Sequence, residues 1–144
     1  MLHSIAESKE IECLPNMKGA LVRHFQEFPS TENGLSLTEQ MSLDMLNEQS
    51  MTAGLMFKKM MTERDPLPWL GDIMYWYILG SMMQAEKPVF AVSASDLQKP
   101  WVERVLTITQ TGREVLSGSQ SWLSLNPPTR WLGGVKLHDH NLCW

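Results

Sequence analysis

The stretch from Trp69 to Gln84 constrains the fold most, because it reads WLGDIMYWYILGSMMQ and carries one charged residue, Asp72. Such an apolar run is too short to span a bilayer. A helix that is apolar on all sides must be buried over most of its surface. The stretch therefore predicts a central helix on which the other elements pack, with Gly71-Asp72 at its start, where a carboxylate meets free N–H groups. A strand over 73–79 is the alternative, since Ile, Tyr and Trp favour strands, but the length and the Met/Leu/Gln tail favour a helix.

The composition fits one globular domain rather than a disordered chain, with 43% apolar and 19% charged residues among 144. The net charge of −4 gives no support for a nucleic-acid partner, because phosphate-binding domains usually carry a basic surface. The N-terminus lacks the apolar core of a signal peptide, so we expect a cytoplasmic protein without a membrane partner. Cys13 and Cys143 are expected to be free thiols there, with a disulfide as the alternative.

Residues 1–13 show no period and predict a flexible N-terminal tail, followed by one domain over 14–144. Apolar residues at helical spacing predict a helix over 14–28, with Arg23 and Glu27 mostly toward water. Ser36-Leu-Thr-Glu39 matches a capping box for a second helix that ends near Glu48. A third helix is expected over 50–64.

The second half of the chain predicts short strands and another helix. Strands over 89–92 and 101–109 would pair as a hairpin. Thr109 or Thr111 would cap a helix that contains Leu116, and strands over 130–137 and 141–144 would follow. The expected core consists of large apolar residues from all these elements: Leu21, Phe25, Met41, Leu55, Trp76, Leu79, Leu106 and Leu116.

This order of three helices, a hairpin and a helix predicts a mainly α fold with small β structure, a winged helix-turn-helix-like domain with a short C-terminal β hairpin. In it, 50–64 is the positioning helix and 69–84 the recognition helix. A DNA reader needs Arg, Lys, Asn or Gln on the recognition helix, and only Gln84 qualifies, at the wrong end. DNA binding by a winged-helix regulator is therefore the alternative function, with contacts expected from the nearest basic residues: Lys58, Lys59, Arg64 and Arg104.

Four segments occur in an order that matches a known family: 28–39, 70–76, 106–116 and 130–137, which reads RWLGGVKL. From Leu14 onward the chain resembles the C-terminal part of uncharacterised bacterial proteins that carry the domain of unknown function 1835. The resemblance implies that the chain corresponds to the C-terminal part of a larger bacterial protein, whose upstream domain is absent here. It implies no activity, cofactor or catalytic residue, because the family has no established one.

The spread of tryptophans predicts a contact surface, because a single small core is not expected to enclose all of them. Trp is enriched among residues that anchor protein interfaces. The expected interface residues are Trp69, Trp101, Trp122 and Trp131, with Trp144 as a further one. The predicted function is a non-catalytic protein-interaction module, whose partner is a second copy or the upstream domain of the family.

Sites for metals, phosphates or catalysis lack support in the sequence. His138, His140 and Cys143 could be metal ligands, but structural zinc needs about four, and His3, Cys13 and His24 would have to complete the set from afar. Gly133-Gly134 lies in no phosphate-binding motif, and no nucleophile motif surrounds the Ser, His and Asp residues. We therefore expect no cofactor and no catalytic residue.

We predict that the chain does not bind duplex DNA specifically, because its expected recognition helix offers almost no group for base edges. A titration with genomic DNA fragments at several salt concentrations measures this. Sub-micromolar affinity with a steep salt dependence would contradict the prediction and favour the regulator.

Overall fold

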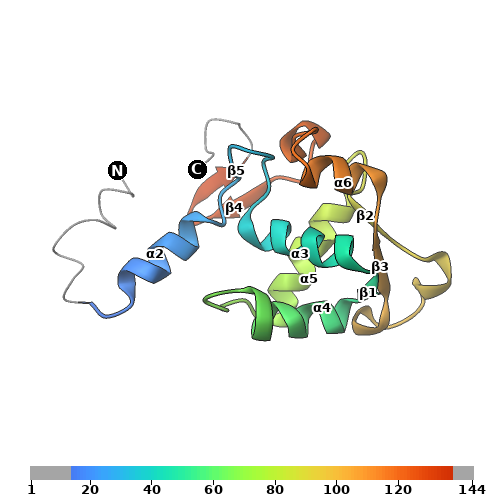
Figure 1. The fold of residues 1–144 in the computed structure, drawn as a ribbon, viewed down its shortest axis with the longest axis horizontal. Helices are drawn as coiled ribbons and strands as arrows, with labels where there is room; N and C mark the ends of the chain where they lie inside the picture. The colour runs from blue at the N-terminus through green and yellow to red at the C-terminus, as the bar shows by residue number, and fades with distance from the viewer. Residues whose placement is uncertain (1–13, 138–144) are drawn as a thin grey trace.

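Residues 14–137 are described in this computed structural model, and they form mainly α-helix with small antiparallel sheets (Figure 1). This confirms the mainly α class with small β structure. The α-helices are α2 (Met17–Phe25), α3 (Leu37–Glu48), α4 (Ala53–Lys59), α5 (Asp72–Met83) and α6 (Gln110–Leu116). None of the helices in the described range is long and apolar enough to cross a bilayer.

The capping box that starts α3 is confirmed. The Ser36 hydroxyl accepts a hydrogen bond from the Glu39 backbone N–H at 3.4 Å, and the Glu39 carboxylate accepts one from the Ser36 N–H at 2.8 Å. Both donors would otherwise lack partners in the first helical turn. The helix ends at Glu48, as the sequence predicts.

The third helix begins later than the sequence predicts. Met51–Thr52 forms a short strand, β1, and the Thr52 hydroxyl then caps α4 by accepting a hydrogen bond from the Leu55 N–H. The last turn is a π-helix, η2 (Met60–Arg64). Antiparallel pairing of Met51 with Leu106 overrides the local preference, and it leaves Leu55 41% exposed while Met56 is buried. The placement of Leu55 in the core was therefore wrong.

The main sheet has the strand order β1-β3-β2, with all pairs antiparallel. Strands β2 (Phe90–Val92) and β3 (Val105–Ile108) confirm the expected hairpin, although β3 is shorter than predicted. The loop between them contains two short 3₁₀-helices, η3 (Ala94–Asp96) and η4 (Trp101–Glu103). Trp101 thus lies in a helical turn rather than in the strand.

A hairpin forms where one strand over 130–137 was expected. After the 3₁₀-helix η5 (Trp122–Leu125), strand β4 (Arg130–Leu132) pairs with β5 (Val135–Leu137). Gly133 and Gly134 turn the chain with φ values of 56° and 81°, which favour glycine. The strand expected over 141–144 lies outside the described residues.

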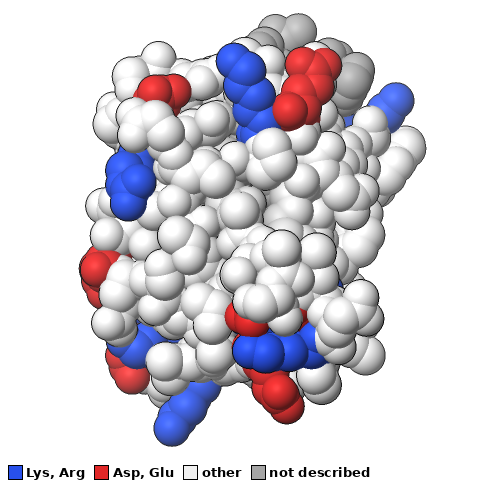
Figure 2. All heavy atoms as spheres, turned by 90° about the vertical axis from the view of Figure 1, so that its right-hand side faces the viewer, with Lys and Arg blue, Asp and Glu red and all other residues white. Residues whose placement is uncertain are grey.

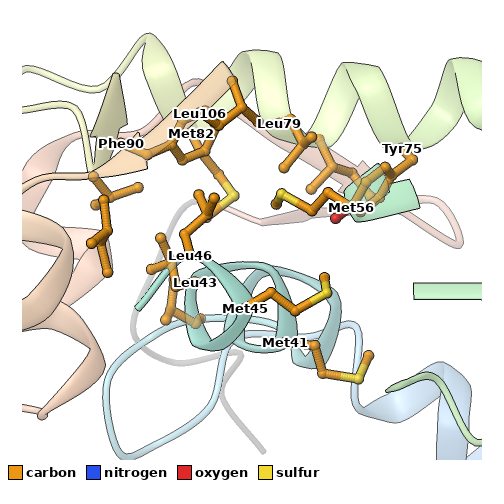
Figure 3. Close-up of a cluster of buried hydrophobic side chains, with 14 of the residues drawn as sticks. Met41, Leu43, Met45, Leu46, Met56, Tyr75, Leu79, Met82, Phe90 and Leu106 are labelled. Atoms are coloured by element: carbon orange, nitrogen blue, oxygen red, sulfur yellow. The ribbon is translucent and has the colours of Figure 1, made fainter. Parts of the chain in front are cut away.

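The core lies between α3, α4, α5 and the sheet, and Figure 3 shows methionine and leucine side chains meeting there. Of the predicted core residues, Met41, Leu79 and Leu106 are buried. Apart from Leu55, the remaining predicted core residues are partly buried: Leu21, Phe25, Trp76 and Leu116.

The junction between β3 and α6 needs a glycine. The Thr109 hydroxyl accepts a hydrogen bond from the Gly112 N–H and donates one to the Pro88 carbonyl. This brings α6 so close to the neighbouring chain that a Cβ on Gly112 would lie 2.0 Å from the Val89 oxygen. The predicted Thr109 cap is confirmed, and Gly112 makes the close approach possible.

We expect Gly112→Ala to destabilise the protein by about 2–3 kcal/mol, because the added methyl group forces the backbone apart. Gly80→Ala in α5 is the matched control, since nothing lies within 4 Å of its Cβ position. It should stabilise the protein by about 0.5–1 kcal/mol through helix propensity. Urea unfolding measures both, and equal effects of the two substitutions would contradict the packing described here.

Candidate functional site

Helix α5 is buried on one side only, contrary to the expectation that most of its surface is buried. Tyr75, Leu79 and Met82 face α3 and α4 and are fully buried (Figure 3). On the opposite side Ile73 is 76% exposed and Tyr77 is 57% exposed. A helix whose single charged residue is Asp72 can therefore be half exposed here, because α3, α4 and the sheet cover only one of its faces.

The exposed α5 face consists of Ile73, Met74 and Tyr77. Met74 is 52% exposed, and Leu67 and Trp69 in the preceding loop, at 45% and 51% exposure, lie toward α2 instead. Contiguous apolar surface of this kind marks interaction sites more often than isolated apolar residues do. The exposed α5 face is the candidate functional site.

A groove of about 310 Å³ runs beside the exposed α5 face. Ile73, Tyr77 and Gly80 line it from the helix, and Trp101 and Pro128 line it from other segments. The glycine contributes no side chain, so the groove deepens at that point. Its walls are mostly apolar and aromatic, which suits an apolar side chain better than a charged ligand.

The indole rings of Trp76 and Trp101 form one wall of the groove. They are stacked with centroids 5.1 Å apart and planes inclined by 14°. The Arg104 guanidinium lies over the Trp101 ring, with its central carbon 5.6 Å from the ring centre. Gly54 in α4 allows the segment that carries Trp101 to pack closely against this helix, because a Cβ on Gly54 would lie 2.9 Å from the Val102 backbone oxygen. The hairpin loop is thereby fixed against α4 and α5.

The base of the same hairpin loop is fixed by Asp96. Its carboxylate pairs with the Lys99 ammonium at 2.7 Å and accepts a hydrogen bond from the Val105 N–H at 3.1 Å. The Lys99 contact and the Val105 hydrogen bond lower the pKa of Asp96. The loop that carries Trp101 is therefore closed by a charged side chain at neutral pH.

Tyr75 locks the buried side of α5 to α3. Its hydroxyl lies 2.9 Å from the Ser42 hydroxyl, which donates its own proton to the Thr38 carbonyl at 2.7 Å. Ser42 has one proton, so Tyr75 is the donor between them. Burial raises the pKa of the Tyr75 phenol, against the opposing effect of the Ser42 hydrogen bond, and keeps it protonated. This bond fixes the rotation of α5 and hence which residues face outward.

Arg23 holds the loop that leads into α5. Its guanidinium binds both Asp65 oxygens, at 2.9 and 2.7 Å, and one Glu27 oxygen at 2.6 Å. Thr38 also accepts a hydrogen bond from it, and donates one to Glu27. Burial by itself lowers the pKa of Arg23, but the hydrogen bonds with Asp65 and Glu27 outweigh it and raise the pKa. The guanidinium stays charged, and Asp65 in turn accepts a hydrogen bond from the Leu67 N–H.

The expectation that Arg23 and Glu27 point to water was wrong, since both are almost completely buried. Their spacing of four residues is a signal of an ion pair on one helix face. That spacing does not predict burial, because the second partner of Arg23 is Asp65. The fold brings Asp65 to the guanidinium from 42 residues away. Arg130 adds a similar tie between distant segments, by donating hydrogen bonds to Glu39 and to the Glu27 carbonyl.

The four tryptophans expected at an interface are not brought together. Trp69 is 51% exposed in the loop before α5 and lines a pocket with Ala20 of α2, whereas Trp101 is half buried in the wall of the groove. Trp131 is 65% exposed in the β4–β5 hairpin, away from the groove-lining residues. Trp122 is 3% exposed and belongs to the core, so it cannot anchor a partner. It is buried because η5, which carries it, packs against the core.

The basic residues expected to contact nucleic acid do not form a free positive surface. Arg64 pairs with Glu48 at 2.5 Å, and Arg104 donates to the Lys99 carbonyl while it covers Trp101. Lys58 is exposed and Lys59 is half buried at the end of α4. Figure 2 views the side on which loop 93–104 lies, and shows Lys and Arg interspersed with Asp and Glu around a largely uncharged centre.

The candidate metal ligands His138, His140 and Cys143 lie outside the described residues, as do His3 and Cys13. Within 14–137, no group of three His, Cys, Asp or Glu residues could hold a metal ion. His24, the remaining candidate, lies against the rings of Phe25 and Phe28.

We expect Arg23→Met to cost about 3–5 kcal/mol of stability, because it leaves two buried carboxylates without their cation. Arg64→Met is the matched control, since the Arg64–Glu48 pair is exposed to solvent and should contribute less than about 1 kcal/mol. Urea unfolding at neutral pH compares them. Similar small losses for both variants would show that the Arg23 cluster does not hold the loop.

Comparison of the chain with protein-family models, with curated proteins and with solved structures finds no match.

Proposed function

We propose that the chain is a non-catalytic protein-interaction module of winged-helix type, which binds its partner through the exposed α5 face. The observation that carries this proposal is the exposure of Ile73, Met74 and Tyr77 on a helix whose other side is fully packed. Covering such side chains removes apolar area from water, which stabilises a complex by about 25 cal/mol per Å² before the cost of association.

The order of elements supports the winged-helix interpretation. Helix α3 precedes the short strand β1, α4 and α5 follow it, and the β2–β3 hairpin closes a sheet in the order β1-β3-β2. In this interpretation α5 takes the place of the recognition helix, and loop 93–104 takes the place of the wing. The Trp76–Trp101 stack then joins recognition helix and wing into one surface.

The chemistry of this surface favours a protein over DNA. Among the exposed residues of α5, Asp72 is acidic and Ile73, Met74 and Tyr77 are apolar or aromatic, while Gln84 lies beyond the end of the helix. A helix that reads base edges needs donors such as Arg, Lys, Asn or Gln along that face. A fold of this type does not fix the function, and here the side chains argue for contact with protein.

The resemblance to the family with domain of unknown function 1835 remains a prediction from the sequence. It supplies one natural partner for the exposed α5 face, namely the upstream domain of the larger bacterial protein. A second copy of the chain is the other partner that the sequence predicts.

A photo-crosslinking amino acid at position 77 tests the proposal in cells, with position 22 as the control because Val22 in α2 is also exposed, at 44%, and does not line the groove. We expect a product of defined mass from position 77 and none from position 22. Tyr77→Arg and Ile73→Arg in the unlabelled protein should compete poorly for that product, while changing stability by less than about 0.5 kcal/mol as surface substitutions.

Mass spectrometry then identifies the cross-linked chain. No product from position 77, or the same set of products from both positions, would contradict a docking role for the exposed α5 face.

A further inference from the structure

We infer that Met74 is a reversible oxidation site, and that its conversion to methionine sulfoxide by a peroxide weakens docking at the exposed α5 face. This inference rests on the proposed function, because it names a regulation of the same surface. It goes further in assigning a chemical modification to one side chain and in stating what that modification changes. It holds for any protein partner with an apolar contact surface.

The fold divides the methionines into protected and accessible ones. The sequence has eleven, of which Met1 lies outside the described residues. Six are buried in the core with at most 9% exposure: Met41, Met45, Met51, Met56, Met60 and Met82. Met61 and Met83 are partly buried against the same core. The exposed methionines of the described range are Met17, at 37%, and Met74, at 52%. A peroxide dissolved in water therefore reaches the Met74 side chain most easily among them.

The chemistry is the transfer of one oxygen atom with two electrons. The thioether sulfur attacks one oxygen of hydrogen peroxide, an S–O bond forms and the O–O bond breaks. The leaving hydroxide takes the proton of the transferred oxygen and departs as water, so sulfur is oxidised and the peroxide is reduced. Methionine sulfoxide reductases reverse the step with a thiol reductant. The exposure that admits the peroxide to Met74 also leaves the sulfoxide open to such an enzyme.

Met74 belongs to the exposed α5 face itself. Residues three positions apart are neighbours on a helix surface, so position 74 lies next to position 77. Ile73, Met74 and Tyr77 are each more than half exposed. The flexible, polarisable thioether suits an adaptable apolar contact. A partner that covers Ile73 and Tyr77 therefore covers Met74 as well.

Oxidation affects the free and the docked states unequally. A sulfoxide carries a polar oxygen in place of the weakly accepting thioether. In the free protein Met74 is 52% exposed, so water solvates this oxygen and the fold loses no contact. Against an apolar partner surface the oxygen loses its water without gaining a donor, which is unfavourable. Oxidation should therefore lower the affinity of the exposed α5 face and leave the stability of the protein unchanged.

Met17 supplies a matched control within the chain. It is exposed like Met74 but belongs to α2, and it does not line the groove beside α5. It should be oxidised under the same conditions, and its oxidation should leave docking unchanged. Comparison of the two methionines therefore separates the chemistry of exposed thioethers from the effect of position.

Peptide mapping by tandem mass spectrometry, after mild treatment of the full chain with hydrogen peroxide, tests the site without any partner. We expect Met74 to be oxidised at least about tenfold faster than Met56, because a buried sulfur reacts only when the structure opens. A methionine sulfoxide reductase with a thiol reductant should restore the thioether. Equal rates for the two residues would overturn the inference.

Competition for the cross-link from position 77 tests the effect on docking. Oxidised, unlabelled protein should require at least about fivefold higher concentration than untreated protein to suppress that product, because a buried acceptor is left without a donor. Met17→Leu should show the same loss on oxidation. Met74→Leu should compete equally well before and after peroxide treatment, whatever its own affinity. Matching thermal melts of oxidised and untreated protein exclude unfolding as the cause.

The outcomes separate this inference from the function on which it rests. A position-77 product that oxidised and untreated protein suppress equally overturns the oxidation site as a regulator and leaves the interaction module in place. A loss of competition that persists in Met74→Leu also overturns it, because another residue is then responsible. No product from position 77 overturns both, because there is then no docking to regulate.

Discussion

The structure depends on how α5 is rotated against α3 and α4. Tyr75 is fully buried and donates to Ser42, whose hydroxyl is committed to a backbone carbonyl, so this polar pair has one satisfied arrangement. Leu79 and Met82 follow Tyr75 along the same side into the core. A rotated α5 would bury an unsatisfied phenol, which costs about 1–3 kcal/mol. The same constraint that builds the core therefore selects the residues that remain exposed.

Two distant contacts keep the exposed side open and rigid. Arg23 binds Asp65 at the start of the loop into α5, and the Trp76–Trp101 stack holds the β2–β3 loop against the helix. Gly54 makes room for that loop, so the groove wall comes from tight packing rather than from a mobile segment. A preorganised surface loses little conformational freedom on binding, which favours its use as a docking site.

Charge placement separates the two functions that this arrangement of elements could serve. The buried charges bind one another, as Arg23, Glu27 and Asp65 do, and Arg64 and Arg104 are engaged by Glu48 and by the Trp101 ring. Helix α5 presents apolar groups at the surface instead. Association through such a surface depends on removal of apolar area from water rather than on counterion release from phosphates.

The sequence by itself determined the features that depend on neighbouring residues. The Ser36–Glu39 capping box, the Thr109 cap, the helix at 72–83 and the β2–β3 hairpin need only local hydrogen bonds and periodicity, and all four form. Tertiary structure decided the rest. Pairing of Met51 with Leu106 converted a predicted helical turn into β1, and Asp65 brought Arg23 inside. Which side of α5 stays exposed could not be read from a helix that is apolar all round, because only the covering elements distinguish its faces.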